Sequence, residues 1–65
     1  MEDDQKIIAA QETFIKDMFG AEAAASANYG WSIDDGGVCT KVYNKGGCNF
    51  VTSEIVGDEV MHECD

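Results

Sequence analysis

The pentapeptide Ala27-Asn28-Tyr29-Gly30-Trp31 marks the point where the chain changes character. An Ala-rich segment with high helix propensity precedes it, and a segment rich in Gly and Asp follows it. Two aromatic residues flank a glycine here, although only 9% of the chain is aromatic. We therefore divide the chain into a helical segment, residues 1–27, and a Gly- and Cys-rich segment, residues 28–65.

Upstream of this boundary, residues 4–19 are predicted to form an amphipathic helix. Large apolar residues recur there at helical spacing and form one stripe: Ile7, Ile8, Phe14, Ile15, Met18 and Phe19. Asp3 or Asp4 can cap the first turn. Gly20 ends or softens the helix, and residues 21–27 can resume it. The stripe is either the core of the protein's own fold or a docking face for a small recognition domain.

Downstream, alternating apolar and polar residues predict a β-hairpin. Residues 38–43 and 48–56 are the strand candidates, and residues 59–65 are expected to be an acidic tail. Turns are expected by composition at residues 34–37, 44–47 and 57–58. An isolated hairpin is marginal in water. The expected fold class is α+β, with an N-terminal amphipathic helix and a marginal hairpin, or else a mostly disordered chain with a flexible core region.

The 65 residues carry a formal net charge of −9, from 13 acids against four bases. Nucleic acid and anionic membrane surfaces are disfavoured as partners because both are bound through Lys and Arg, whereas a basic protein suits this charge. The acidic N-terminus lacks the positive start of a secretory signal, and no stretch approaches the roughly 20 apolar residues of a membrane span. We expect a cytoplasmic chain that is monomeric when free, has reduced cysteines, and yields a mature product that could be exported.

No self-contained catalytic set is apparent, so we expect neither an enzyme nor a cofactor bound by this chain. His62 and Cys64 are close in sequence, but a frayed tail cannot orient and desolvate a catalytic dyad. The cysteines and the one histidine could form a tetrahedral zinc site, from Cys39, Cys48, His62 and Cys64. Their spacing is not that of a zinc knuckle, so no metal is expected. The odd number of cysteines leaves all single disulfide pairings open.

An acidic helical N-terminus, a double glycine and a following segment with Cys, Ser and Thr resemble a bacterial ribosomal precursor peptide. In such families a maturase recognises a leader and modifies the core that follows it. The double glycines are Gly36-Gly37 and Gly46-Gly47, although each also fits a simple turn. Lanthionine formation would use residues such as Cys39, Thr40, Cys48, Thr52, Ser53 and Cys64. The core is more acidic, and poorer in Ser and Thr, than that chemistry suggests.

Asn28-Tyr29-Gly30 resembles the short motif of splicease substrates, a match that covers residues 27–31. The resemblance implies a radical S-adenosylmethionine maturase with a 4Fe–4S cluster that excises a tyramine-equivalent unit. Tyr29 would be the excised residue, Asn28 would become an α-keto-β-amino acid, and Gly30 would be the small neighbour. Trp31 and the apolar stripe of the helix would be the recognition residues, bound by the maturase or by a small recognition protein.

Two hypotheses about function follow. In the first, which we favour from the sequence, the helical segment is a leader and Asn28-Tyr29-Gly30 is modified by another enzyme. A helix terminus followed by Gly-rich chain opens at low cost, which would let this site enter an enzyme pocket. In the second, the chain is a folded acidic α+β module that binds or inhibits a basic protein. The rings of Tyr29 and Trp31 would then pack against the helix, on Phe14, Met18 and Phe19.

Overall fold

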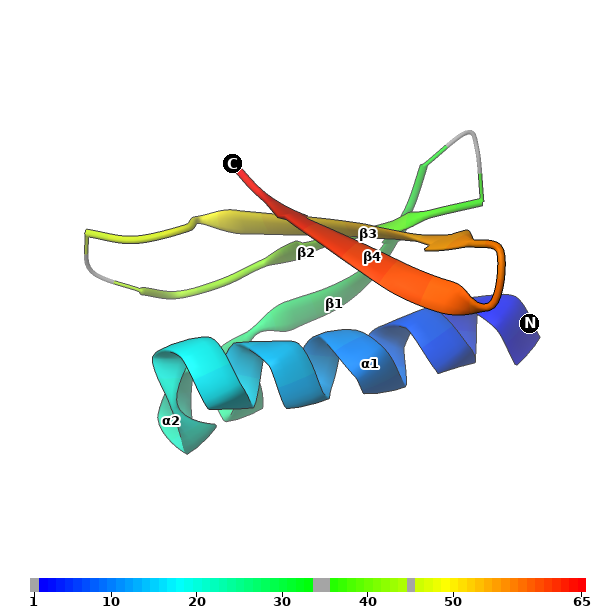
Figure 1. Cartoon of the computed structure of the whole chain (residues 1–65). Coiled ribbons are helices and arrows are strands. Elements are labelled where there is room, and N and C mark those ends of the chain that lie inside the picture. The colour runs from blue at the N-terminus through cyan, green and yellow to red at the C-terminus, as the bar shows by residue number, and fades with distance from the viewer. Residues whose placement is uncertain (1, 34–35, 45) are drawn as a thin grey trace.

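The computed structural model describes residues 2–33, 36–44 and 46–65 of the chain (Figure 1). In these ranges two helices precede four strands: α1 (Glu2–Phe19), α2 (Ala21–Ser26), β1 (Asn28–Ser32), β2 (Val38–Lys41), β3 (Phe50–Val56) and β4 (Glu59–Cys64). The α+β class expected from the sequence is confirmed, and the sheet is larger than a single hairpin. Neither helix in this part of the chain is long and apolar enough to cross a membrane.

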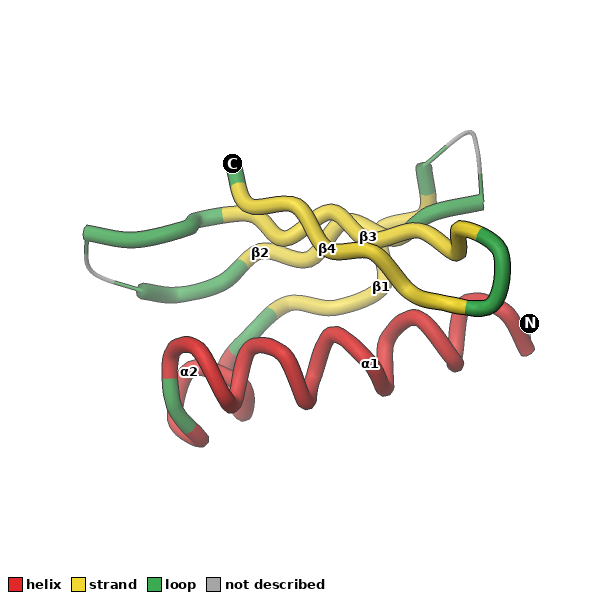
Figure 2. The backbone as a smooth tube through the Cα atoms, in the orientation of Figure 1, coloured by secondary structure: helices red, strands yellow, loops and turns green. Residues whose placement is uncertain are grey.

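The strands form one antiparallel sheet in which neighbours in space are neighbours in sequence, in the order β1-β2-β3-β4. Figure 2 shows α1 lying across one face of this sheet, where it contacts every strand. α2 packs against α1. Within the described ranges, no helix or strand covers the opposite face. We call the face toward α1 the inner face and the opposite face the outer face.

α1 presents one side to the sheet because its buried residues recur about once per helical turn. Ile7, Gln11 and Ile15 are fully buried there. The predicted helix is confirmed, although it begins slightly earlier than expected, at Glu2. It ends where Gly20 adopts a φ of 101°, which L side chains rarely tolerate. The chain then resumes as α2, as the Ala-rich sequence predicted.

The inner face of the sheet is built from alternate residues of the two predicted strands. These residues point toward α1 and are almost fully buried: Val38, Thr40, Val42, Val51 and Ser53. The ladder extends past β2, because the Val42 amide donates a hydrogen bond of 2.8 Å to the Asn49 carbonyl. Both strand predictions are thus confirmed, with shorter bounds.

The turn predicted at residues 57–58 is also confirmed, since it joins β3 to β4. The turns predicted at residues 34–37 and 44–47 include Asp34, Asp35 and Lys45, which lie outside the described residues. The flanking segments are antiparallel partners in each case, as a hairpin requires.

The expectation of an acidic tail at residues 59–65 was wrong. β4 pairs with β3 over its whole length, from Glu59 opposite Val56 to Cys64 opposite Val51. The charge of this segment made it resemble a solvated tail, but its residues alternate between two environments. The inner-face positions are those of Val60, His62 and Cys64, and the outer-face positions are those of Glu59, Met61 and Glu63. The carboxylates of the two glutamates are exposed to solvent.

The sequence analysis also assigned no strand to the residues directly after the Ala-rich helical segment. Asn28–Ser32 is a strand that pairs with β2, so the chain enters the sheet directly after α2. The Gly in this stretch suggested a break in structure. Glycine within a strand often marks a β-bulge instead, and that is what β1 contains.

Candidate functional site

Asn28-Tyr29-Gly30-Trp31 lies in β1, an edge strand that pairs only with β2. The register between β1 and β2 shifts between Asn28 and Trp31, so β1 carries one extra residue there. Gly30 has a φ of 98° within this bulge. The extra residue reverses the usual alternation of the strand, and Tyr29 and Trp31 therefore point to opposite faces of the sheet.

Tyr29 turns inward and joins the core. Its ring packs against the cluster that contains Ile15 and Val51. Its hydroxyl donates a hydrogen bond of 2.7 Å to the Ala24 carbonyl at the end of α2. Burial, and secondarily the Glu12 carboxylate, raise the pKa of this phenol above its ordinary value. Tyr29 thus connects α2 to the core, through its hydrogen bond to Ala24 and the packing of its ring.

Trp31 turns outward and is 49% exposed. It lies opposite Cys39 of β2, which in turn lies opposite Thr52 of β3, so the three residues form a row across the outer face. The next residue, Ser32, returns to the inner side and donates a hydrogen bond of 3.3 Å to the Asp4 carboxylate. Of the two rings that the second hypothesis packs against the helix, only Tyr29 is in the core.

The apolar stripe proposed for recognition faces the protein's own sheet in this fold. Ile7 and Ile15 are fully buried, and Ile8, Phe14 and Phe19 are half-buried. Met18 alone of the stripe is mostly exposed. A partner could bind these residues only after α1 leaves the sheet, so the intramolecular interpretation describes the folded chain.

The structure does not gather the candidate zinc ligands into one site. Cys39 lies on the outer face, where the Thr52 hydroxyl lies 3.8 Å from its sulfur, within hydrogen-bonding distance. The inner side carries Cys48, His62 and Cys64, with His62 apart, beside Ser53. Among the described residues, no group of three or more His, Cys, Asp and Glu side chains is arranged to hold a metal ion.

His62 belongs to β4 and not to a frayed tail, which corrects the expectation from the sequence. Its ring stacks on Phe14 of α1, with centroids 4.5 Å apart and planes 16° from parallel. Its Nδ1 lies 2.6 Å from the Ser53 hydroxyl. Burial lowers the pKa of His62 below its ordinary value, because the cation loses hydration there.

The Ser53–His62 pair could suggest a catalytic dyad, but Ser53 is fully buried and no substrate can reach its hydroxyl. The pair instead extends a buried polar network around Gln11. The Gln11 amide nitrogen lies within 2.9–3.1 Å of Val38 O, Val51 O and Ser53 Oγ, and its oxygen accepts a hydrogen bond from Thr40. The network satisfies these buried groups and fixes α1 in register on the sheet.

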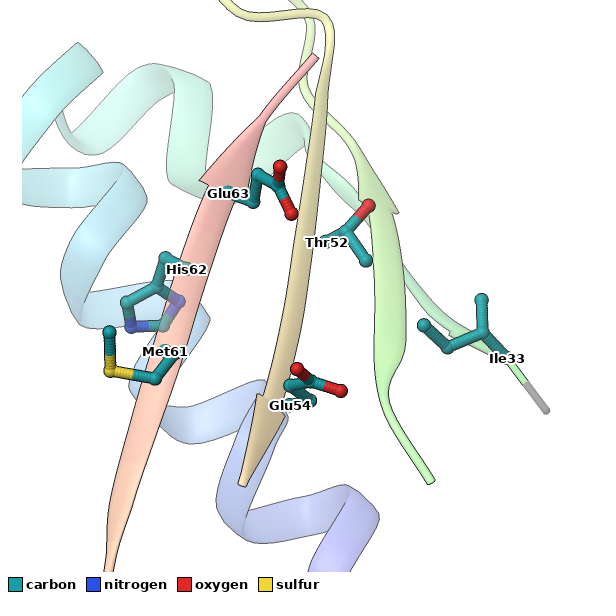
Figure 3. A pocket seen from close by; sticks show the side chains of 6 residues that line it. All are labelled: Ile33, Thr52, Glu54, Met61, His62 and Glu63. Carbon is teal, nitrogen blue, oxygen red and sulfur yellow. The ribbon is translucent and has the colours of Figure 1, made fainter. Parts of the chain in front are cut away.

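The outer face is hollowed where β3 and β4 meet the segment after β1. This depression has a volume of about 360 Å³ and is lined by Ile33, Thr52, Glu54, Met61, His62 and Glu63. In Figure 3 the side chains of Glu54 and Glu63 both extend over the sheet beside Thr52, with Met61 and Ile33 on either side. The concavity therefore combines two carboxylates with two apolar walls.

Ile33 reaches this depression by lying over Gly37. A Cβ atom at Gly37 would approach the Ser53 carbonyl oxygen to 2.7 Å and the Ile33 Cδ1 atom to 2.8 Å, so a larger residue would displace one of them. One glycine of the Gly36-Gly37 pair is thus required by packing. Gly37, which belongs to a double glycine that resembled a processing motif in the sequence, therefore has a structural role in this fold.

Most of these outer-face residues were missed as functional candidates. From the sequence, Glu54 falls in the strand predicted at residues 48–56, and Met61 and Glu63 fall in the segment expected to be a tail. The signal that could have located them is the alternation of Glu59, Met61 and Glu63 with Val60, His62 and Cys64. That period of two is weak evidence in a segment of six residues, two of which are acidic.

Comparison with known proteins gave no match to a family model, to a curated protein or to a solved structure. Function must therefore be argued from the geometry of this chain. On the outer face, the carboxylates of Glu54 and Glu63 could pair with a cation, and the apolar side chains beside them could pack against the aliphatic part of the same side chain. A Lys or Arg side chain of another protein has both parts.

Proposed function

We propose that the protein is a small acidic binding module that docks a basic surface of another protein on the outer face of its sheet. The observation that carries this proposal is the one-sided fold. α1 covers only the inner face, and the outer face presents Glu54, Glu59 and Glu63 among the exposed side chains of Trp31, Val56 and Met61. Exposed apolar residues rimmed by charge are typical of interaction surfaces.

The charge distribution favours a basic partner over other kinds. A net charge of −9 on 65 residues attracts a basic protein and repels nucleic acid and anionic lipid. The Lys41 ammonium lies over the Tyr43 ring, 5.4 Å from its centroid, and Lys41 is not among the residues that line the depression. The carboxylates of the depression are therefore available for a cation of the partner, whose stem would pack on Met61 and Ile33.

Binding, and not catalysis, is the activity that this surface supports. The depression is lined by two carboxylates, a threonine hydroxyl, two apolar side chains and His62. General acid–base chemistry requires a titratable group oriented toward a bound substrate. The His62 ring is instead held on the inner side, where it stacks on Phe14 and its Nδ1 lies beside the fully buried Ser53 hydroxyl.

The proposal is tested with a peptide of alternating Arg and Leu as a model basic ligand, titrated into the ¹⁵N-labelled protein. We expect the largest amide shifts in β3 and β4, and weaker binding at higher salt. Replacing both carboxylates, Glu54→Gln with Glu63→Gln, should weaken binding by roughly 10-fold, as expected for two exposed ion pairs. The same charge change on the exposed side of α1, Glu12→Gln with Asp17→Asn, should have much less effect. Equal losses in the two variants would show attraction by net charge alone.

A second candidate function is the precursor role suggested by Asn28-Tyr29-Gly30. It is supported by the position of these residues on an edge strand, with Asn28 and Gly30 exposed and only one strand to be released. A radical S-adenosylmethionine maturase with a 4Fe–4S cluster would separate β1 from β2 and act on the backbone at Tyr29. A cytoplasmic location would suit both the maturase and the reduced cysteines.

Co-expression with a splicease and intact-mass measurement tests this second candidate. Conversion would remove one tyramine equivalent, and Tyr29→Phe should abolish or alter the loss while keeping the ring in the core. The Tyr43→Phe variant is the matched control, because Tyr43 is exposed and lies outside the motif. An unchanged mass in the wild-type chain under conditions where a known substrate is converted would reject the precursor role.

A further inference from the structure

Cys48 and Cys64 meet at one end of the sheet although they are far apart in sequence. The chain after β4 returns to the segment that begins β3, as Figure 1 shows near the C-terminus. The Asp65 amide donates a hydrogen bond of 2.9 Å to the Phe50 carbonyl, and the Asp65 carbonyl accepts hydrogen bonds from Asn49 and Phe50. The residue after Cys64 is therefore bonded to the residues just after Cys48.

The two side chains converge on the same side of the sheet. The Cys48 thiol donates a hydrogen bond of 2.9 Å to the Phe50 carbonyl, the same oxygen that accepts from Asp65. Cys48 also packs against the core cluster that contains Val51. Cys64 lies directly opposite Val51 in the β3–β4 ladder and thus shares its inner side.

The electrostatics of the pair agree with this geometry. The pKa of the Cys64 thiol is raised to about 11, first by burial and then by its hydrogen bond and charge interaction with Cys48. This interaction agrees with the backbone pairing, which brings Cys64 and Cys48 to the same end of the sheet. Cys39 is on the outer face beside Thr52, separated from both by the sheet.

We propose that Cys48 and Cys64 are a reversible disulfide pair that cross-links the C-terminal strand to the loop before β3, while Cys39 remains a thiol. The oxidant is a low-molecular-weight disulfide. One protein thiolate attacks it, forming a mixed disulfide and releasing one small thiol. The second protein thiolate then attacks the mixed disulfide, which forms the Cys48–Cys64 bond and releases the second small thiol. Two protein thiols are oxidised and one small disulfide is reduced to two thiols.

Two physical reasons favour this pair over the two pairings that involve Cys39. Cys48 and Cys64 lie on the same side of the sheet at neighbouring backbone segments, so a bridge needs little backbone movement, whereas Cys39 would have to cross the sheet. The cross-link also closes a loop of about 16 residues around the β3–β4 hairpin, which removes conformational freedom from the unfolded chain. Among the described strands β4 lies at an edge of the sheet, so the cross-link would tie an edge strand to the loop before β3.

The test treats the full chain with oxidised glutathione at mildly alkaline pH and then alkylates the remaining thiols under denaturing conditions. We expect a mass lower by two hydrogens and a single alkylated cysteine, Cys39, identified by peptide mapping. The melting temperature should rise by about 10 °C or more, as a loop of this length predicts, and should return after reduction. Oxidation should be faster at higher pH, because the thiolate is the attacking species.

Serine variants separate the cross-link from general packing effects. Cys64→Ser changes an exposed residue and should abolish both the mass loss and the rise in melting temperature, while its reduced form melts like reduced wild type. Cys39→Ser should leave both effects intact. Disulfides that involve Cys39, or three alkylated cysteines after oxidation, would overturn the proposal. These outcomes do not depend on whether the outer face binds a basic partner.

Discussion

The two faces of this sheet are made by the same strands but do different things. On the inner face, alternate residues are fully buried under α1, and even the polar ones, Gln11, Thr40 and Ser53, have hydrogen-bond partners. On the outer face, Trp31, Val56 and Met61 are each about half exposed beside carboxylates. Most of the buried contacts that stabilise the fold therefore lie on the inner face, and the outer face is the surface that we propose for binding.

The comparison also explains how so short a chain reaches a stable fold. A 65-residue domain has a stability of only about 3–10 kcal/mol, so it needs almost every inner-face position. The outer face contributes little because its side chains keep much of their contact with water. Substitutions on the two faces should differ in size, and the predictions below are ordered by that size.

The largest effect is expected from truncating the inner face. Ile15→Ala removes a fully buried side chain from the main cluster and should lower the free energy of unfolding by about 3 kcal/mol. Val56→Ala, on the exposed outer face of β3, should cost less than about 1 kcal/mol. Urea denaturation followed by circular dichroism measures both. Similar losses in the two variants would contradict the division between the faces.

The next effect concerns the polar network of the inner face. Gln11→Ala leaves the Thr40 and Ser53 hydroxyls without their amide partner and opens a cavity, so we expect a loss of about 2–3 kcal/mol. Gln5→Ala changes an exposed glutamine of the same helix and should be neutral within about 0.5 kcal/mol. The same denaturation experiment applies. A neutral Gln11→Ala variant would mean that water replaces the amide.

A smaller loss is expected at the residue that sends Tyr29 and Trp31 to opposite faces. Gly30→Ala places a Cβ in space that is nearly open, 4.0 Å from the Ile8 Cδ1 atom, but at a φ of 98°. The cost is therefore backbone strain alone, about 1–2 kcal/mol. Ser32→Ala in the same strand removes one exposed hydrogen bond and should cost less. Trp fluorescence should shift if the bulge is lost, and an unchanged spectrum with full stability would argue against it.

The smallest effect is a pH dependence that comes from His62. Burial lowers its pKa, so the unfolded chain takes up the proton at a higher pH than the folded chain does. This contribution to stability is complete above the ordinary histidine pKa of about 6.5 and is lost as the pH falls below it. His62→Gln should flatten the dependence of the unfolding free energy between about pH 7.5 and pH 5.5. Identical slopes in the two proteins would remove His62 as the cause.

The sequence predicted α1, α2 and the central strands because each has a strong local signal. Apolar residues at helical spacing located α1, and alternation with Val and Thr located β2 and β3. The edge strands were missed for different reasons. β1 was missed because the bulge at Gly30 interrupts the alternation, and β4 was missed because three of the seven residues 59–65 are acidic.

Only one residue of the outer-face surface was singled out for recognition from the sequence. Trp31 was singled out as a recognition residue and is exposed, but Glu54, Met61 and Glu63 had no role until β4 was placed beside β3. Likewise the three cysteines left every pairing open. Only the return of Asp65 to Phe50 brings Cys48 and Cys64 together and separates them from Cys39.

By itself, the sequence determined the acidic character of the protein, its N-terminal helix and the pattern of its central strands, because charge and periodicity are local properties of the chain. The tertiary structure alone decided that residues 59–64 form a strand, that Tyr29 and Trp31 point apart, and that Gln11 is a core residue. Each of these depends on a partner distant in sequence, on pairing or on burial. A polar or charged segment becomes ordered only when such a partner supplies its hydrogen bonds.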